Sequence, residues 1–182
     1  MKKSILFLIV AFSTISFSKA QIYMGKESLI TFYSHTAVED IDAKNTTGKP
    51  VLDAGKGDIQ VKVTIKGFKF KSGLMEEHFN ENFLESDKYP HAIFKGKINE
   101  KIDYSKDGEH KVTVTGNMEL HGVTKPVNVE GTLTVKGKHV IIDSKFPIKL
   151  SDYKIEDPSI IGKKVAEAVD VTIKSTLEPY KK

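Results

Sequence analysis

The sequence predicts an all-β protein built as one antiparallel domain, either a sandwich or a closed barrel. Two observations predict this class. Several segments alternate apolar and polar residues with a period of two, and glycine-containing turn signals separate these segments. A period of two places one face of a strand in a core and the other face in water. Closing the sheet into a barrel has the further advantage that it leaves no strand edge exposed.

Residues 1–20 have the pattern of a secretory signal peptide. A lysine-containing start precedes the apolar run 5–12, and small residues lead to an expected cleavage site after Ala20. The apolar run is shorter than the roughly 20 residues that a membrane-spanning helix needs. We therefore predict an exported protein, periplasmic or secreted, whose mature domain is 21–182 and has no integral membrane segment after signal cleavage.

The clearest strand is predicted over 59–66, where every odd position is β-branched and every even position is polar. The turn signals 106–108 and 136–138 predict hairpins between neighbouring strands. Further strands are predicted at 91–98, 112–115, 127–129, 133–135, 140–142, 146–150 and 169–173.

One segment breaks the strand pattern and predicts a short amphipathic helix over 73–84. Met75, Phe79 and Phe83 recur every four residues there, with acidic and amide residues between them. Pro90 prevents the helix from continuing into the next strand. A second helical turn is predicted around 160–166, before the final strand.

A buried apolar volume is the main chemical property that this sequence offers. Aromatic residues occur in or beside most of the predicted elements. A barrel of about eight strands either fills its interior with side chains or encloses one small ligand. For a single aromatic residue, plain core packing is the commoner role. A packed barrel and a hollow barrel are therefore both compatible with the sequence.

The sequence has no recognisable catalytic or metal-binding motif. It contains no cysteine and no Gly-x-Ser-x-Gly, and no histidine stands in a His-x-x-x-His pattern. His78 with Glu77 or Glu81 is the one metal candidate, and a solvated helical face explains these residues better. We predict a protein that is not an enzyme and has no metal or cofactor. A metal-dependent hydrolase using His78 is a remote alternative.

The charge pattern argues against nucleic acid as a partner. The formal net charge is +4, and it falls to near +1 when the three lysines of the signal peptide are removed. Every basic residue is lysine, so the guanidinium forks favoured for phosphate and guanine recognition are missing.

Three stretches of the mature chain resemble the YceI-like family. They are ITFYSH at 30–35, FLESDKYPHAIFKG at 83–96 and MELHGVTKPV at 118–127, and the last is the most specific. The sequence differs from the family at 150–155, where the arginine of an Arg-Asx-Phe-Gly-like stretch is missing. The resemblance covers nearly the whole mature chain. Members of this family are exported bacterial proteins of lipocalin-like fold that bind polyisoprenoid lipids.

The resemblance implies a single antiparallel lipocalin-like β-barrel of about eight strands with one or two short helices, enclosing an apolar tunnel. It makes aromatic residues in or beside the matching motifs the leading lipid-binding candidates. These are Phe32, Phe79, Phe83 and Phe94, and the candidate set is completed by Met75, Leu74, Val114 and Phe146.

The function expected from this resemblance is to carry or sequester a long-chain isoprenoid lipid, such as a polyprenyl quinone or a polyprenol, in the bacterial envelope. The alternative is a solid barrel that acts as an envelope stress-response or interaction module without a lipid ligand. The sequence also leaves a homodimer open.

Overall fold

The structure is a computed structural model that describes residues 21–37, 40–156 and 165–180. The predicted signal peptide, 1–20, lies outside the described residues. So does most of the second helical turn predicted at 160–166, and its described residues, Val165 and Ala166, are not helical.

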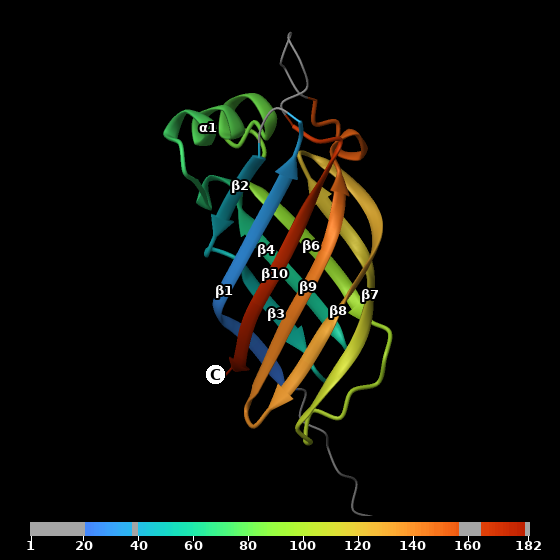
Figure 1. Cartoon of the computed structure of the whole chain (residues 1–182). Helices are drawn as coiled ribbons and strands as arrows, with labels where there is room; N and C mark the ends of the chain where they lie inside the picture. Colours follow the sequence, from blue (N-terminus) through green and yellow to red (C-terminus); the bar gives the residue numbers. More distant parts are fainter. Residues whose placement is uncertain (1–20, 38–39, 157–164, 181–182) are drawn as a thin grey trace, which may run out of the picture.

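Eight antiparallel strands form a closed barrel. In chain order they are β1 (Ile22–His35), β3 (Lys49–Asp53), β4 (Asp58–Thr64), β6 (His91–Ile98), β7 (Gly108–Leu120), β8 (Val123–Lys136), β9 (His139–Lys149) and β10 (Ala168–Pro179). Each strand pairs with the next in this series, and β10 pairs with β1 to close the sheet. The closing register runs from Tyr23 opposite Pro179 to Tyr33 opposite Asp170, and Figure 1 shows the two strands side by side. The predicted antiparallel barrel is confirmed.

Two short strands extend the sheet at one end of the barrel. β2 (Asp40–Asn45) pairs with the second half of β1, and β5 (Phe68–Phe70) pairs with β2. The first residues of β1 pair instead with β3. One edge of β1 therefore has two successive partners, and the wall divides between them.

Asn45 organises the corner at which the chain passes from β2 to β3. Its side chain is fully buried, and its Oδ1 accepts hydrogen bonds from the backbone N and the Oγ1 of Thr47, at 2.7 and 2.8 Å. Its Nδ2 donates to the carbonyl oxygen of Thr64, 2.9 Å away. Because a buried amide is costly when unpaired, these bonds fix the corner that separates β2 from the continuous wall.

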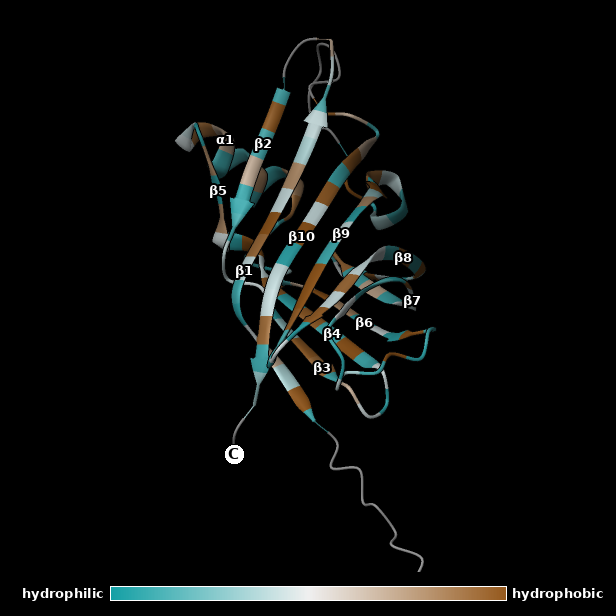
Figure 2. Cartoon of the chain, turned by 60° about the horizontal axis from the view of Figure 1, so that its bottom comes forward, coloured by the Kyte–Doolittle hydropathy of each residue, from teal (hydrophilic) through white to brown (hydrophobic). Residues whose placement is uncertain are grey.

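The period-two pattern is confirmed in the strands. In β4, Ile59, Val61 and Val63 are buried while Gln60 and Lys62 are exposed. Teal and brown bands alternate along the strands in Figure 2. The strand predicted over 59–66 ends at Thr64, and a 3-10 turn, η1 (Ile65–Gly67), follows it.

Tight turns join β7 to β8 and β8 to β9. Residues 137–138 form the second turn, as the glycine signal predicted, whereas the signal at 106–108 lies at the end of a longer connection, 99–107, between β6 and β7. Residues 121–122 form the turn between β7 and β8.

Gly122 and Gly137 form a matched pair for testing whether a neighbouring side chain leaves room for a Cβ atom in these two turns. Both have positive φ angles, 71° and 57°, so alanine at either position costs about 1–2 kcal/mol. A Cβ at 122 would lie 2.5 Å from Cε1 of Tyr89, whereas nothing lies within 4 Å at 137. We expect Gly122→Ala to lower the free energy of unfolding by about 1 kcal/mol more than Gly137→Ala in urea titrations. Equal losses would show that the Tyr89 ring moves aside without cost.

The predicted helix over 73–84 forms in two parts. α1 (Gly73–His78) is followed by η2 (Phe79–Phe83), a π-helical turn in which the backbone N–H of Leu84 donates to the carbonyl oxygen of Phe79 at 2.9 Å. Figure 1 places this segment at one end of the barrel, beside β2. We call α1 and η2 together, residues 73–83, the helical lid.

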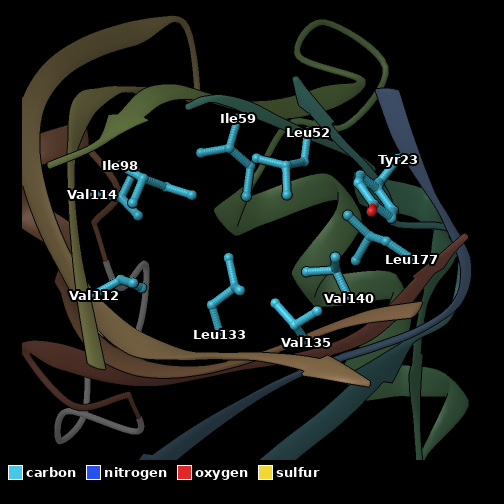
Figure 3. Packing of buried hydrophobic residues seen from close by; sticks show 10 residues of the cluster. All are labelled: Tyr23, Leu52, Ile59, Ile98, Val112, Val114, Leu133, Val135, Val140 and Leu177. Atoms are coloured by element: carbon cyan, nitrogen blue, oxygen red, sulfur yellow. The ribbon is translucent and has the colours of Figure 1, made fainter. Parts of the chain in front are cut away.

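A packed core occupies the opposite end of the barrel. Figure 3 shows side chains from several strands pointing toward a shared interior. These are Tyr23, Leu52, Ile59, Ile98, Val112, Val114, Leu133, Val135, Val140 and Leu177. Ile102 and Tyr104, from the connection between β6 and β7, pack against this core cluster and cover that end.

Ionisation of Tyr104 is expected to lower the free energy of unfolding at alkaline pH. Its ring centroid lies 6.0 Å from that of Tyr23. Burial, with a smaller contribution from Tyr23, raises the pKa of Tyr104 from 10.0 to about 12. A raised pKa means that the neutral phenol stabilises the fold fully below pH 10, and that this contribution is lost as the pH rises through 12. We expect the free energy of unfolding to fall over this interval, and Tyr104→Phe to reduce the fall. An equally steep decline in the variant would contradict the assignment to Tyr104.

The barrel cavity as candidate functional site

An apolar cavity of about 760 Å³ lies inside the barrel. Its lining includes six residues of the helical lid at one end and five members of the core cluster at the other. The volume falls within the range of about 300–1,000 Å³ that is typical of ligand pockets. The barrel is therefore hollow on the lid side and packed at the far end.

All eight residues predicted as lipid-binding candidates line this one cavity. Leu74, Met75, Phe79 and Phe83 come from the helical lid, and Phe32, Phe94, Val114 and Phe146 come from β1, β6, β7 and β9. Leu74 is the most exposed of them, with 61% of its surface accessible, and it lies at the rim. Their role toward a lipid remains a prediction, and their convergence on one apolar volume is a structural fact.

An aromatic cluster joins the helical lid to the wall. The Phe79 ring stacks on Phe32 of β1 with centroids 5.4 Å apart, and it contacts Phe70 and Phe68 of β5 at 5.0 and 5.6 Å. Phe32 also meets both β5 rings edge-on. Such contacts add to the energy of burial, so Phe79 holds the lid against the two strands while one side of the cluster faces the cavity.

His121, in the turn between β7 and β8, contacts both Glu85, which follows the helical lid, and Tyr153. Its Nε2 lies 2.9 Å from Oε2 of Glu85, and its Nδ1 lies 3.1 Å from the carbonyl oxygen of Tyr153. Both partners are acceptors, so the ring makes both hydrogen bonds when each nitrogen carries a hydrogen. The Tyr89 ring packs edge-on against the same imidazole, 4.7 Å away. The His121 side chain therefore links Glu85 and Tyr153 to the turn between β7 and β8.

The wall between β8 and β9 separates on the lid side. Their pairing extends only from Gly131 opposite Ser144 to Lys136 opposite His139. Beyond this point, a 3-10 turn, η3 (Leu150–Tyr153), lies against β8, and the Lys125–Asp152 ion pair, at 3.7 Å, links the two. η3 therefore lies against β8 in the region where β8 and β9 are no longer paired.

Many of the lining residues were not predicted from the sequence. Ile59, Val61 and Val63 are the apolar positions of the period-two pattern in β4. This pattern predicts that their side chains point inward, so it could have identified them as lining residues. Phe68 and Phe70 stand out only as aromatic residues in a short segment. Ile155 carries no periodic signal, because it follows an irregular turn.

His78 lines the cavity at the lid, but the remote metal-site alternative gains no support. Within the described ranges 21–37, 40–156 and 165–180, no group of three or more His, Asp or Glu side chains is arranged to hold a metal ion. In that same part of the chain, no helix has both the length and the apolar character required to span a bilayer.

The sequence matches the family described as YceI-like domain over residues 12–177. The chain belongs to the YceI-like family. The resemblance drawn from the three motif stretches is thereby confirmed, and it extends through the barrel strands that form the cavity.

Two relatives indicate how far the sequence similarity extends. A UPF0312 protein of Pseudomonas fluorescens is 31% identical over 121 residues, which are 63% of this chain and 61% of the relative. Protein YceI of Shigella flexneri is 35% identical over 81 residues, which are 41% of this chain and 39% of the relative. The chain therefore matches about three fifths of the first YceI-like relative and about two fifths of the second.

Solved structures share the fold at lower sequence identity. A polyisoprenoid binding domain from Saccharophagus degradans has a TM-score of 0.75 and 13% identity, with 89% of this chain and all of that chain covered. BcnA of Burkholderia cenocepacia has a TM-score of 0.69 and 18% identity, covering 82% of this chain and 95% of its own. A YceI protein of Campylobacter jejuni has a TM-score of 0.59 and 18% identity, with both chains covered fully. At these identities the likeness establishes the common barrel fold.

Proposed function

We propose that this protein binds a long-chain isoprenoid lipid, such as a polyprenyl quinone or a polyprenol, in the barrel cavity and carries or sequesters it in the bacterial envelope. The observation that carries the proposal is the apolar cavity of about 760 Å³ in a YceI-like chain. The likeness to a solved polyisoprenoid binding domain supports the choice of ligand class.

Burial of apolar surface provides the binding energy. Each Å² of apolar surface removed from water contributes about 25 cal/mol, and a long prenyl chain offers several hundred Å². The lost freedom of the lipid and of the side chains that it orders offsets part of this gain. The aromatic residues around Phe79 provide a large contact surface with little rotamer entropy to lose.

Export is part of the proposal. The signal-peptide pattern of residues 1–20, ahead of a domain over 21–182, supports a periplasmic or secreted address. Binding by burial requires no catalysis, metal or cofactor, so we propose a binding protein and not an enzyme.

The cavity also bears on the alternative, in which a solid barrel acts only through its surface. A solid barrel fills its interior with side chains, whereas here packed side chains occupy one end and an apolar volume the other. This distribution favours a protein that holds a ligand.

Native mass spectrometry of the mature protein, purified from its own envelope fraction, tests the proposed function. Organic extraction and lipid identification follow. We expect a mass above that of the bare chain and a stoichiometric isoprenoid in the extract. A bare mass that stays unchanged after incubation with polyprenyl quinones would sink the proposal and favour the interaction module.

A further inference from the structure

We infer that the cavity accepts isoprenoids with an uncharged head group and rejects phosphorylated ones. This inference rests on the proposed function, and it names the chemical class of the head group. Two sets of residues carry it: the ionisable side chains that line the cavity, and the lysines next to the helical lid.

The part of the cavity lining that the structure describes provides no lysine. Its ionisable side chains, among the described residues, are His78, Glu130 and Asp143, and no lysine accompanies them. A phosphate brought into this apolar volume would lose its hydration without gaining a lysine partner, and an unpaired buried charge is strongly unfavourable. Glu130 is exposed, and Asp143 is ion-paired with Lys174 at 3.1 Å, so neither carboxylate provides a phosphate with a partner.

Two described lysines that precede the lid in the sequence are held by carboxylates. Lys69 is paired with Glu76 of α1, and Lys71 is paired with Asp42 of β2, each with nitrogen and oxygen 2.5 Å apart. The hydrogen bond from Lys69 lowers the pKa of Glu76, and the hydrogen bond to Asp42 raises the pKa of Lys71. A phosphate at the lid would have to compete with these carboxylates for the lysines. The chain also contains no arginine that could replace them.

Uncharged head groups meet a more suitable surface. Ser72, His78 and Asn82 are the polar lining residues at the lid end. Hydroxyl, imidazole and amide groups exchange hydrogen bonds with a hydroxyl or a carbonyl oxygen and require no net charge on the ligand. The lining therefore combines an apolar chamber for the tail with neutral polar groups near the rim.

A competition between two lipids of equal chain length tests the inference. Delipidated mature protein is incubated with an equimolar mixture of undecaprenol and undecaprenyl phosphate, and native mass spectrometry reports the ratio of the two complexes. We expect the alcohol complex to exceed the phosphate complex by about ten-fold or more, since burial of an unpaired charge costs several kcal/mol.

The outcomes separate this inference from the proposed function. A dominant alcohol complex supports both. Equal complexes, or a dominant phosphate complex, would overturn the selectivity while isoprenoid binding stands. Retention of neither lipid would overturn both.

A variant that removes the carboxylate partners of Lys69 and Lys71 tests the role of these two lysines. Asp42→Asn combined with Glu76→Gln removes the carboxylates that hold Lys71 and Lys69 and changes no lining residue. We expect the phosphate complex to gain several-fold relative to the alcohol complex. Asp103→Asn, which removes the partner of Lys106 in the connection between β6 and β7, is the matched control and should leave the ratio unchanged. An unchanged ratio in the double variant would overturn the role given to the two ion pairs.

Discussion

Replacing Phe83 by alanine is expected to weaken retention of a bound isoprenoid by about ten-fold. The Phe83 side chain is half-buried in the helical lid and lines the cavity. Its truncation removes about 50 Å² of apolar surface from contact with the ligand, which corresponds to roughly 1.3 kcal/mol, and 1.4 kcal/mol is a factor of about ten in affinity. The dissociation constant for a polyprenyl quinone, measured by fluorescence or by native mass titration, reports the loss.

Two substitutions outside the cavity provide the controls. Tyr180→Ala removes an aromatic ring that is 54% exposed and does not line the cavity. Lys62→Ala shortens an exposed side chain on β4. Neither change should alter retention by more than a small factor. If Phe83→Ala weakens retention no more than these two, the assignment of Phe83 to the lipid site is wrong.

Local sequence patterns predicted most of the regular structure after residue 58, but not the short strands β2, β3 and β5. The strand expected at 91–98 coincides with β6, and the helix expected at 73–84 coincides with α1 and η2 to within one residue. Both signals act over a few residues: alternation reports a strand with one buried face, and a four-residue repeat reports a helix with one apolar face. The four-residue repeat did not indicate the π-helical geometry of η2.

The parts that escaped prediction depend on contacts between distant segments. At the corner between β2 and β3, the Asn45 side chain donates a hydrogen bond to the carbonyl oxygen of Thr64, 19 residues away. The pairing of β8 with β9 stops at Gly131 and Ser144, and η3 lies against β8. No local periodicity reports which strand edges stay paired, so the divided wall and the packing of η3 become visible only in three dimensions.

The candidate site was predicted in its composition but not in its shape. Aromatic residues in or beside the matched motifs led to Phe32, Phe79 and Phe94, and all three line the cavity. Whether the barrel is hollow depends on how side-chain volumes fill the space between strands far apart in sequence. The aliphatic residues of the core cluster fill one end. At the other end, residues of the lid and of β5 line the open chamber.

Replacing Gly116 by alanine is expected to produce the largest loss of stability among the glycine substitutions considered for this barrel. Gly116 of β7 stands opposite Gly96 of β6. A Cβ at 116 would lie 2.3 Å from the carbonyl oxygen of Lys95 and 2.5 Å from the Cα of Gly96. Both neighbours are backbone atoms, so no rotamer change relieves the contact, and the two strands must separate. We expect the free energy of unfolding to fall by about 3 kcal/mol, at the upper end for overpacked sites.

Two neighbouring substitutions distinguish this backbone clash from a general sensitivity of the strand pair. Asn117→Ala alters an exposed side chain on the same strand and should change stability by no more than about 0.5 kcal/mol. Gly96→Ala would place its Cβ 2.7 Å from Cζ of Phe94, the end of a side chain that lines the cavity. Rotation of that ring relieves part of the contact, so Gly96→Ala should cost less stability than Gly116→Ala and should alter the cavity instead. A Gly116→Ala protein as stable as Asn117→Ala would mean that β6 and β7 need not approach so closely for the barrel to form.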